Sequence, residues 1–275
     1  MLEALVVGLI GSSALVMGGV LGAMWNAPAQ VSGILLAFAS GSLIAALAFE
    51  LFPEAVEVGG LGPSALGLFC GGLVFVVVNT LLDSRVAVGA GEASDVAAPA
   101  PIAAAVAGAE ADQSEKLATA ASRSVGQAST GIAFALLAAV TLDGVPENIA
   151  LGVSLGGVDQ GISGIVALLA AIFVSNFPES MVGAVAMRSA ERSRGFVIAI
   201  WTGTAVMLTG AVILGSAVAG GMGPGALAFA LAFAGGAVLA SLADTLMPEA
   251  FEKGRPFNAL ATALGFLLAF VLADL

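Results

Sequence analysis

Hydrophobic residues in this chain gather in long, nearly uninterrupted runs, separated by short connections of Gly, Pro, Asn and charged residues. A helix of about 20 apolar residues crosses the hydrocarbon core of a bilayer, whereas the strands of a membrane barrel are shorter and alternate polar with apolar positions. The pattern therefore predicts an all-α integral membrane protein with eight transmembrane helices, at about residues 2–24, 30–54, 61–82, 130–155, 162–188, 195–219, 225–250 and 256–274.

One stretch breaks this pattern. Residues 83–129 are rich in Ala, Gly, Ser and Pro and carry scattered acids, which is typical of a flexible linker. The predicted organisation is then helices 1–3 in residues 1–82, a flexible loop over 83–129, and helices 4–8 in residues 130–275, which together form one transmembrane domain.

Composition supports the membrane prediction and narrows the function. The chain is 59% hydrophobic and 10% charged, more apolar than a soluble domain can bury. Its net charge of -11 excludes nucleic acid as a sensible partner, so the expected surroundings are the lipid bilayer. There is no His, the commonest transition-metal ligand, and Cys70 is the one cysteine.

Basic residues predict the orientation. All eight fall in the connections after predicted spans three, five and seven, and none falls in those after spans two, four or six. By the positive-inside rule the odd connections, including residues 83–129, are cytoplasmic, and both termini lie outside. We therefore expect a multi-pass protein of the plasma or inner membrane. The basic residues are Arg85, Lys116, Arg123, Arg188, Arg192, Arg194, Lys253 and Arg255.

The second and seventh predicted spans end alike, in Pro53-Glu54-Ala55 and Pro248-Glu249-Ala250. The two spans run in opposite directions in the predicted topology, which is the sign of inverted repeats, helices 1–3 against 6–8, around a central helix pair 4–5. Glu50 and Asp244 each lie about one turn before a Pro-Glu pair; they are either stations on a transport pathway or acids at a helix end. Four further acids are expected to be solvated: Glu54, Glu57, Glu249 and Glu252.

Two Pro-Glu pairs also interrupt the central runs, Pro146-Glu147 and Pro178-Glu179. Proline lacks an amide hydrogen, so the carbonyl four residues earlier loses its helical partner. In hydrocarbon such a carbonyl is tolerated where it lines a polar cavity or meets a cation. Asp143 lies four residues before Glu147 and so shares its helix face. No Lys or Arg lies near the centre of a predicted span to pair with these acids.

We interpret this arrangement as a cation site formed by Asp143, Glu147 and Glu179, to which Ser175 and Asn176 add neutral oxygens. Three carboxylates brought together repel one another, so they need protons or a bound cation. A divalent ion would neutralise two of the three charges. Protons should then compete with the metal, and metal binding is expected to weaken at acid pH.

The pattern resembles the ZIP family of divalent metal transporters over nearly the whole chain, in its eight spans, outer termini, long loop after span three and Pro-Glu motifs in spans four and five. Both central Pro-Glu pairs match the family motifs outright. The family's span-four pattern, roughly His-Asn-x-Pro-Glu-Gly, is replaced at its other named positions by Asp143, Gly144 and Asn148. Ser175 stands at a His or Gln position, Asn176 at an Asp or Asn position, and Glu50 at or near a frequent His.

The resemblance implies a secondary transporter, not an enzyme, that moves divalent metal cations of the zinc, iron and manganese class into the cytoplasm. It implies an elevator-like motion of the central helices, with metal as the substrate and no cofactor. Oxygen-only ligands shift the preference from zinc toward manganese, iron(II), magnesium or calcium. The sixth span has no acid for a bridged second site, so we expect one metal, or a weak second one.

Other readings of the same residues stay open. A cation/calcium exchanger also carries Pro-Glu motifs, although in distant halves of its chain. An intramembrane aspartyl protease needs two Asp, for which Asp143 and Asp244 are candidates without suitable neighbours. A metal-sensing membrane protein would bind metal without flux. The sequence has no phosphate-binding glycine loop to drive a pump, and it leaves monomer against homodimer undecided.

Overall fold

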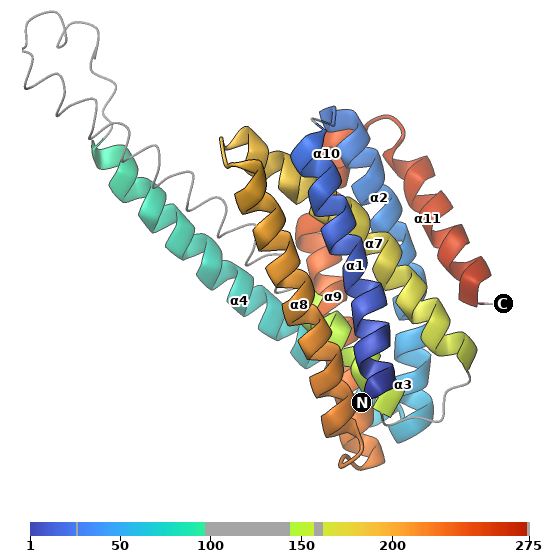
Figure 1. Cartoon of the computed structure of the whole chain (residues 1–275). Helices are drawn as coiled ribbons and strands as arrows, with labels where there is room; N and C mark the ends of the chain where they lie inside the picture. Colours follow the sequence, from blue (N-terminus) through green and yellow to red (C-terminus); the bar gives the residue numbers. More distant parts are fainter. Residues whose placement is uncertain (26, 97–143, 157–161, 274–275) are drawn as a thin grey trace, which may run out of the picture.

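The computed structural model describes residues 1–25, 27–96, 144–156 and 162–273 of the chain, and these residues form a bundle of helices (Figure 1). Six of the described helices are long and apolar enough to cross a membrane. This confirms a multi-pass α-helical membrane protein. The six spans are Leu2–Met24, Ala29–Gly59, Leu61–Leu81, Ile165–Ser189, Arg194–Ala219 and Pro224–Gly254.

The helices follow the predicted spans closely. Helix α1 covers Leu2–Met24 and α8 covers Arg194–Ala219, within one residue of the predicted bounds. Helix α7 covers Ile162–Ser189. The last predicted span is α11, Asn258–Ala273, a helix of 16 residues. Of the fourth predicted span, residues 144–156 are described and helical, and the rest lies outside the described residues.

The predicted linker begins too early. Helix α4 starts at Leu61 but continues to Val96, past the predicted span end at residue 82. The stretch from 83 to 96 contains no proline, the residue that most strongly stops a helix, and its three alanines favour one despite Gly89 and Gly91. The remainder of the predicted loop, residues 97–129, lies outside the described residues.

The second and seventh predicted spans share one internal plan. Each has an α-helix of 18 residues, a π-helical turn of five and a final α-helix of eight: α2 (Ala29–Ala46), η1 (Leu47–Leu51) and α3 (Phe52–Gly59), against α9 (Pro224–Ser241), η2 (Leu242–Leu246) and α10 (Met247–Gly254). A shift of 195 in residue number converts the first set into the second. We call α3 and α10 the two Pro-Glu arms.

These two spans run in opposite directions. The end of α3, at Gly59, lies against Pro224 at the start of α9, while the end of α10, at Gly254, lies against Gly33 near the start of α2. A Cβ atom on either terminal glycine would come within 3 Å of the other helix, so the backbones touch. The arms therefore lie at opposite ends of the bundle, as Figure 1 shows. We name these the α3 end and the α10 end.

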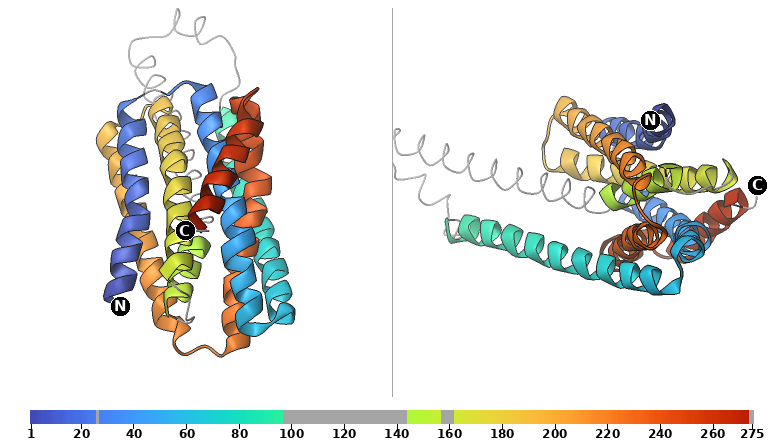
Figure 2. Two further views of the ribbon diagram at one scale, coloured as in Figure 1. Left: turned by 90° about the vertical axis from the view of Figure 1, so that its right-hand side faces the viewer. Right: turned by 90° about the horizontal axis from the view of Figure 1, so that it is seen from below.

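The third helix of each half packs on the other half, α4 on α9 and α11 on α2. Figure 2 shows these helices side by side from two further directions. In both of these helix–helix contacts, which we call seams, a glycine lies against a backbone carbonyl. A Cβ on Gly71 would lie 1.9 Å from Phe233 O, and one on Gly265 would lie 1.9 Å from Phe38 O. Phe38 and Phe233 are related by the same shift of 195, so the second and third helices of the two halves are packed alike.

Each central helix packs closely on the first helix of one half. Residues 144–156 pack on α8, where a Cβ on Gly215 would lie 2.3 Å from Ile149 O. Helix α7 packs on α1, where a Cβ on Gly22 would lie 2.3 Å from Met181 O. Ile149 and Met181 each come two residues after the Glu of a central Pro-Glu pair. The glycines let these backbones approach closely, as in other membrane helix pairs.

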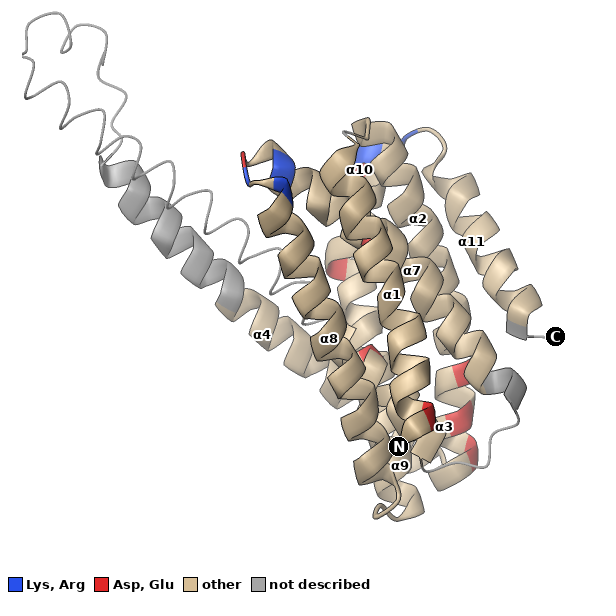
Figure 3. Ribbon diagram, viewed as in Figure 1, with Lys and Arg blue, Asp and Glu red and all other residues tan. Residues whose placement is uncertain are grey.

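The two ends of the bundle differ in charge. The Lys and Arg residues whose side chains the structure describes gather at the α10 end, in α10 and around the α7–α8 connection (Figure 3). Around α3, at the opposite end, the described charged residues are acids (Figure 3). This separation agrees with the asymmetry read from the sequence.

Candidate functional site

The described members of the predicted cation site lie within the two central helices. Glu147 is 8% exposed, Ser175 is fully buried, Asn176 is 1% exposed and Glu179 is half-buried. Asp143 lies outside the described residues. The burial of these polar groups agrees with the sequence interpretation, while the meeting of the two Glu carboxylates around one ion stays a prediction.

Residues one turn after the two central Pro-Glu pairs belong to different core clusters, each of which includes residues of one arm. Ala150, one turn after Glu147, packs in one core cluster with Leu51 and Ala55 of the first arm region. Val182, one turn after Glu179, packs with Leu246 and Ala250 of the second. Equivalent positions of the two central helices thus share a core cluster with equivalent positions of the two halves, while α7 also contributes Leu168, Ala171 and Ile172 to the cluster of the first arm.

Pro178 lies inside α7. Because its nitrogen carries no hydrogen, it cannot donate to the carbonyl of Val174, which is then available to a cation or to water. Ser175 does not help this carbonyl, since its hydroxyl donates to Ile172 O at 3.0 Å. That bond within its own helix makes Ser175 the weakest of the predicted ligands.

Two buried asparagines carry polar atoms that make no hydrogen bond with any described residue: the Oδ1 atom of Asn148 and the Nδ2 atom of Asn176. Asn148 Nδ2 donates to Gly144 O at 2.8 Å, which fixes that side chain along its own helix. A buried amide atom without a partner costs free energy. Asn176 was predicted from the sequence, whereas Asn148 was noted as a departure from the family pattern but not as part of a site.

A contact that the sequence did not predict joins the first arm to a central helix. Ser154 Oγ donates to Glu54 Oε2 at 3.0 Å. Ser154 is fully buried, and Glu54 is 6% exposed. The expectation that Glu54 is solvated is therefore wrong. Ser154 comes seven residues after Glu147, on the same helix face and about 10 Å along the axis. The seven-residue spacing between Glu147 and Ser154 was the signal in the sequence that could have indicated a role for Ser154.

The other acids near the arms are more exposed, as the sequence suggested. Glu57 and Glu252 are exposed. Glu249 Oε1 forms an ion pair with Lys253 Nζ of the same helix at 2.5 Å. Asp244, in η2, accepts a hydrogen bond from Asn79 Nδ2 of α4 at 2.8 Å. Glu50, in η1, is half-buried. The π turns thus each carry one acid beside a Pro-Glu pair.

Within the described ranges, no three Asp, Glu, Cys or His side chains come together to hold a metal ion. Two carboxylates of the predicted set, Glu147 and Glu179, fall in those ranges. The chemistry that the described residues offer is that of hard oxygen ligands in an apolar surround, which suits a divalent cation better than it suits acid–base catalysis on an organic substrate.

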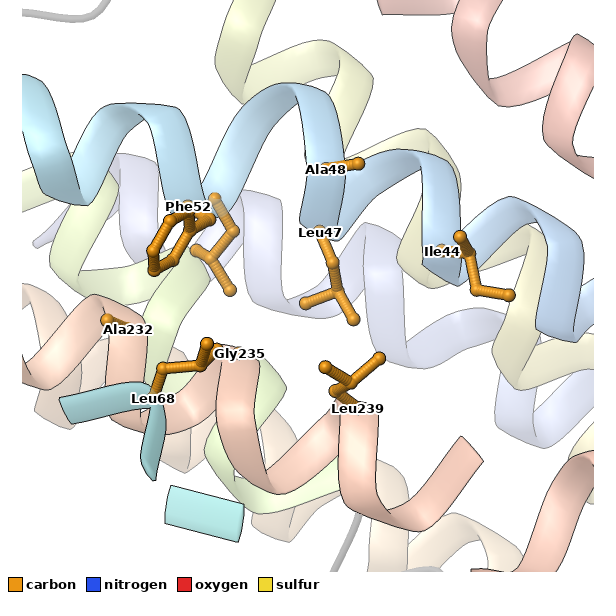
Figure 4. Close-up of a pocket in the computed structure, with 9 residues that line it drawn as sticks. Ile44, Leu47, Ala48, Phe52, Leu68, Ala232, Gly235 and Leu239 are labelled. Atoms are coloured by element: carbon orange, nitrogen blue, oxygen red, sulfur yellow. The ribbon is translucent and has the colours of Figure 1, made fainter. Parts of the chain in front are cut away.

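A crevice of about 240 Å³ opens beside η1, but its chemistry is wrong for a cation. Figure 4 shows Ile44, Leu47 and Phe52 on one side and Leu68, Ala232 and Leu239 on the other. All of its lining side chains are apolar. Ile44 and Leu239 are related by the shift of 195, so the crevice lies where the two halves meet.

Comparison with models of known protein families finds no match for this chain. Comparison with curated proteins finds no related sequence either.

Proposed function

We propose that this protein is a secondary transporter that moves divalent metal cations across a membrane, as its resemblance to the ZIP family implies. The observation that carries the proposal is the paired arrangement of Pro-Glu helices. Two equivalent spans of opposite direction each end in a Pro-Glu arm, and the first arm is hydrogen-bonded to a central helix that has a Pro-Glu pair of its own. Inverted repeats around a central pair with buried acids are typical of secondary transporters.

The proposed topology has eight spans. Residues 130–155 and 256–274 form the fourth and eighth, beside the six long helices. With the α10 end in the cytoplasm, both termini are outside, and the basic residues at that end obey the positive-inside rule. Alternating access comes from motion of the central helices against the outer ones, in the manner of an elevator.

Metal is bound by Glu147 and Glu179 together with Asp143, and Asn176 adds an amide oxygen when its side chain is turned. Burial makes an empty site costly for such acids, which favours a bound cation. The set consists of oxygens, so manganese, iron(II), magnesium and calcium are favoured over zinc. Transport runs into the cytoplasm without ATP.

Metal uptake into liposomes by the purified protein tests this proposal. Glu147→Gln and Glu179→Gln should each lower the initial rate more than tenfold, because each removes a ligand charge from the buried site. The matched control is Glu249→Gln, which changes the half-exposed Glu of a Pro-Glu arm and should leave the rate within twofold. A panel of competing metals then ranks the substrates. Full uptake by both central variants would exclude the proposed site.

A further inference from the structure

Ser154 and Glu54 form a hydrogen bond that links a central helix to the first Pro-Glu arm. It joins two buried side chains on different helices. Two other bonds between helices differ from it: the bond of Asn79 with Asp244 involves exposed groups, and the bond of Ser180 with Ala14 O ends on a backbone carbonyl. A buried bond to a carboxylate is among the stronger polar contacts in a protein.

The bond connects an arm of the outer framework to a central helix, beside the core cluster that Ala55 and Ala150 share. Glu54 lies in the first turn of α3, which packs on α9. Ser154 lies near the end of the helix 144–156, which packs on α8 and carries Glu147. At the α3 end this bond therefore ties the helix with the proposed metal ligand to the outer framework, about two turns beyond that ligand.

The opposite end of the bundle has no matching tie among the described residues. The counterpart of Glu54 is Glu249, which pairs with Lys253 one turn along the same helix. The counterpart of Ser154, 32 residues later in α7 as Glu179 is to Glu147, is Ala186. Alanine has no hydroxyl to donate. The framework thus holds one central helix at the α3 end and leaves the other without this bond at the α10 end.

We propose that the Glu54–Ser154 bond is a latch, which keeps the α3 end closed and must break before the site between the central helices can open to that side. Glu54 acts in this scheme as a positioning residue through its hydrogen bond, and its charge is not needed to bind metal. The inference rests on the proposed transport function for its biological meaning. The opening itself is a property of the fold that can be measured without metal.

Cysteine labelling of the closed seam tests the latch. Cys70→Ala first removes the one native thiol. The reporter is Ala55→Cys, next to Glu54, at a fully buried position in the cluster that includes Ala150. Its control is Ala250→Cys, the counterpart in the other arm, which is 3% exposed. A water-soluble maleimide added to the protein in detergent reports how often each seam opens.

Ser154→Ala should speed labelling of the Ala55→Cys reporter about tenfold, because losing a hydrogen bond to a charged group shifts an equilibrium by about this factor. Glu54→Ala should do the same. Glu54→Gln keeps an acceptor oxygen for the serine hydroxyl, and Ser154→Thr keeps the donor, so both should label within threefold of the parent. The Ala250→Cys reporter should not respond to any of them.

Three results would overturn the latch. Ser154→Ala could label at the parental rate, or the Ala250→Cys reporter could speed up equally, which would mean general loosening. Thirdly, Glu54→Gln could label as fast as Glu54→Ala while losing metal uptake, which would make the carboxylate charge the important property. If the labelling follows expectation but the parent moves no metal, the transport proposal fails and the latch remains as a feature of the fold.

Discussion

The two Pro-Glu arms have the same lengths and the same π turn before them, yet their glutamates have different surroundings. Glu54 is 6% exposed and bonded to a central helix, whereas the Glu249 side chain is 42% exposed and paired with its own helix. The local backbone is therefore not what buries a carboxylate here. The residues that face each arm decide it.

Two differences in residue type accompany this contrast, one between the halves and one between the central helices. Lys253, which pairs with Glu249, has Val58 as its counterpart in the first arm, so Glu54 has no base one turn later. Ser154, which bonds Glu54, has Ala186 as its counterpart in α7. Glu249 thus contacts a polar partner in its own helix, whereas Glu54 contacts one in a central helix. The two arms have the same backbone, and the residue differences at Val58/Lys253 and Ser154/Ala186 make their surroundings different.

The largest test of this comparison reverses the charge in each arm. Glu54→Lys places an ammonium group in a buried seam where a serine hydroxyl points at it, and burying an uncompensated charge should cost about 3 kcal/mol or more. Glu249→Lys changes a half-exposed pair at the α10 end and should cost less than about 1 kcal/mol. Thermal unfolding of both variants in detergent gives the two losses. Similar losses would show that the arms are in equivalent surroundings, against the contacts described here.

Much of the framework could be predicted from the sequence because its signals are strong and local. Apolar runs bounded by Gly and Pro predicted the six long helices to within a few residues at most ends. The match between Pro53-Glu54-Ala55 and Pro248-Glu249-Ala250 predicted an inverted pair of spans. The π turns were not predicted, since the residues Leu47–Leu51 carry no pattern that separates i to i+5 bonding from an ordinary helix.

The site was less predictable because burial depends on contacts distant in sequence. Glu54 and Ser154 are 100 residues apart, and nothing near Glu54 shows that a serine hydroxyl reaches it. Composition also misplaced the end of α4, since residues 83–96 are polar but lack the proline that would stop a helix. The burial of Glu147 and Asn176, by contrast, follows from acids and amides placed inside apolar runs.

A second test asks whether the halves are equivalent where the structure says that they are. A Cβ on Gly41 would lie 1.9 Å from Thr262 O, and one on its counterpart Gly236 would lie 2.0 Å from Leu68 O. Alanine at either position should force the helices apart and cost about 1–3 kcal/mol. Gly210→Ala is the control, because open space surrounds that position and alanine there should gain up to about 1 kcal/mol of helix propensity. Unfolding that responds to one seam only would contradict the shared packing plan.

The smallest effect separates the two polar contacts by their response to salt. Lys253→Ala removes an exposed pair one turn long, so it should cost about 0.5 kcal/mol or less and the cost should vanish at about 1 M salt, where screening is nearly complete. Ser154→Ala removes a buried hydrogen bond to a carboxylate and should lower the free energy of unfolding by about 1.5 kcal/mol or more. This loss should persist at high salt, because counter-ions do not reach the buried contact. Unfolding of both variants at low and high salt measures the four values. A cost for Ser154→Ala that disappears with salt would mean that water and ions enter beside Glu54, and the two arms would then differ in sequence but not in environment.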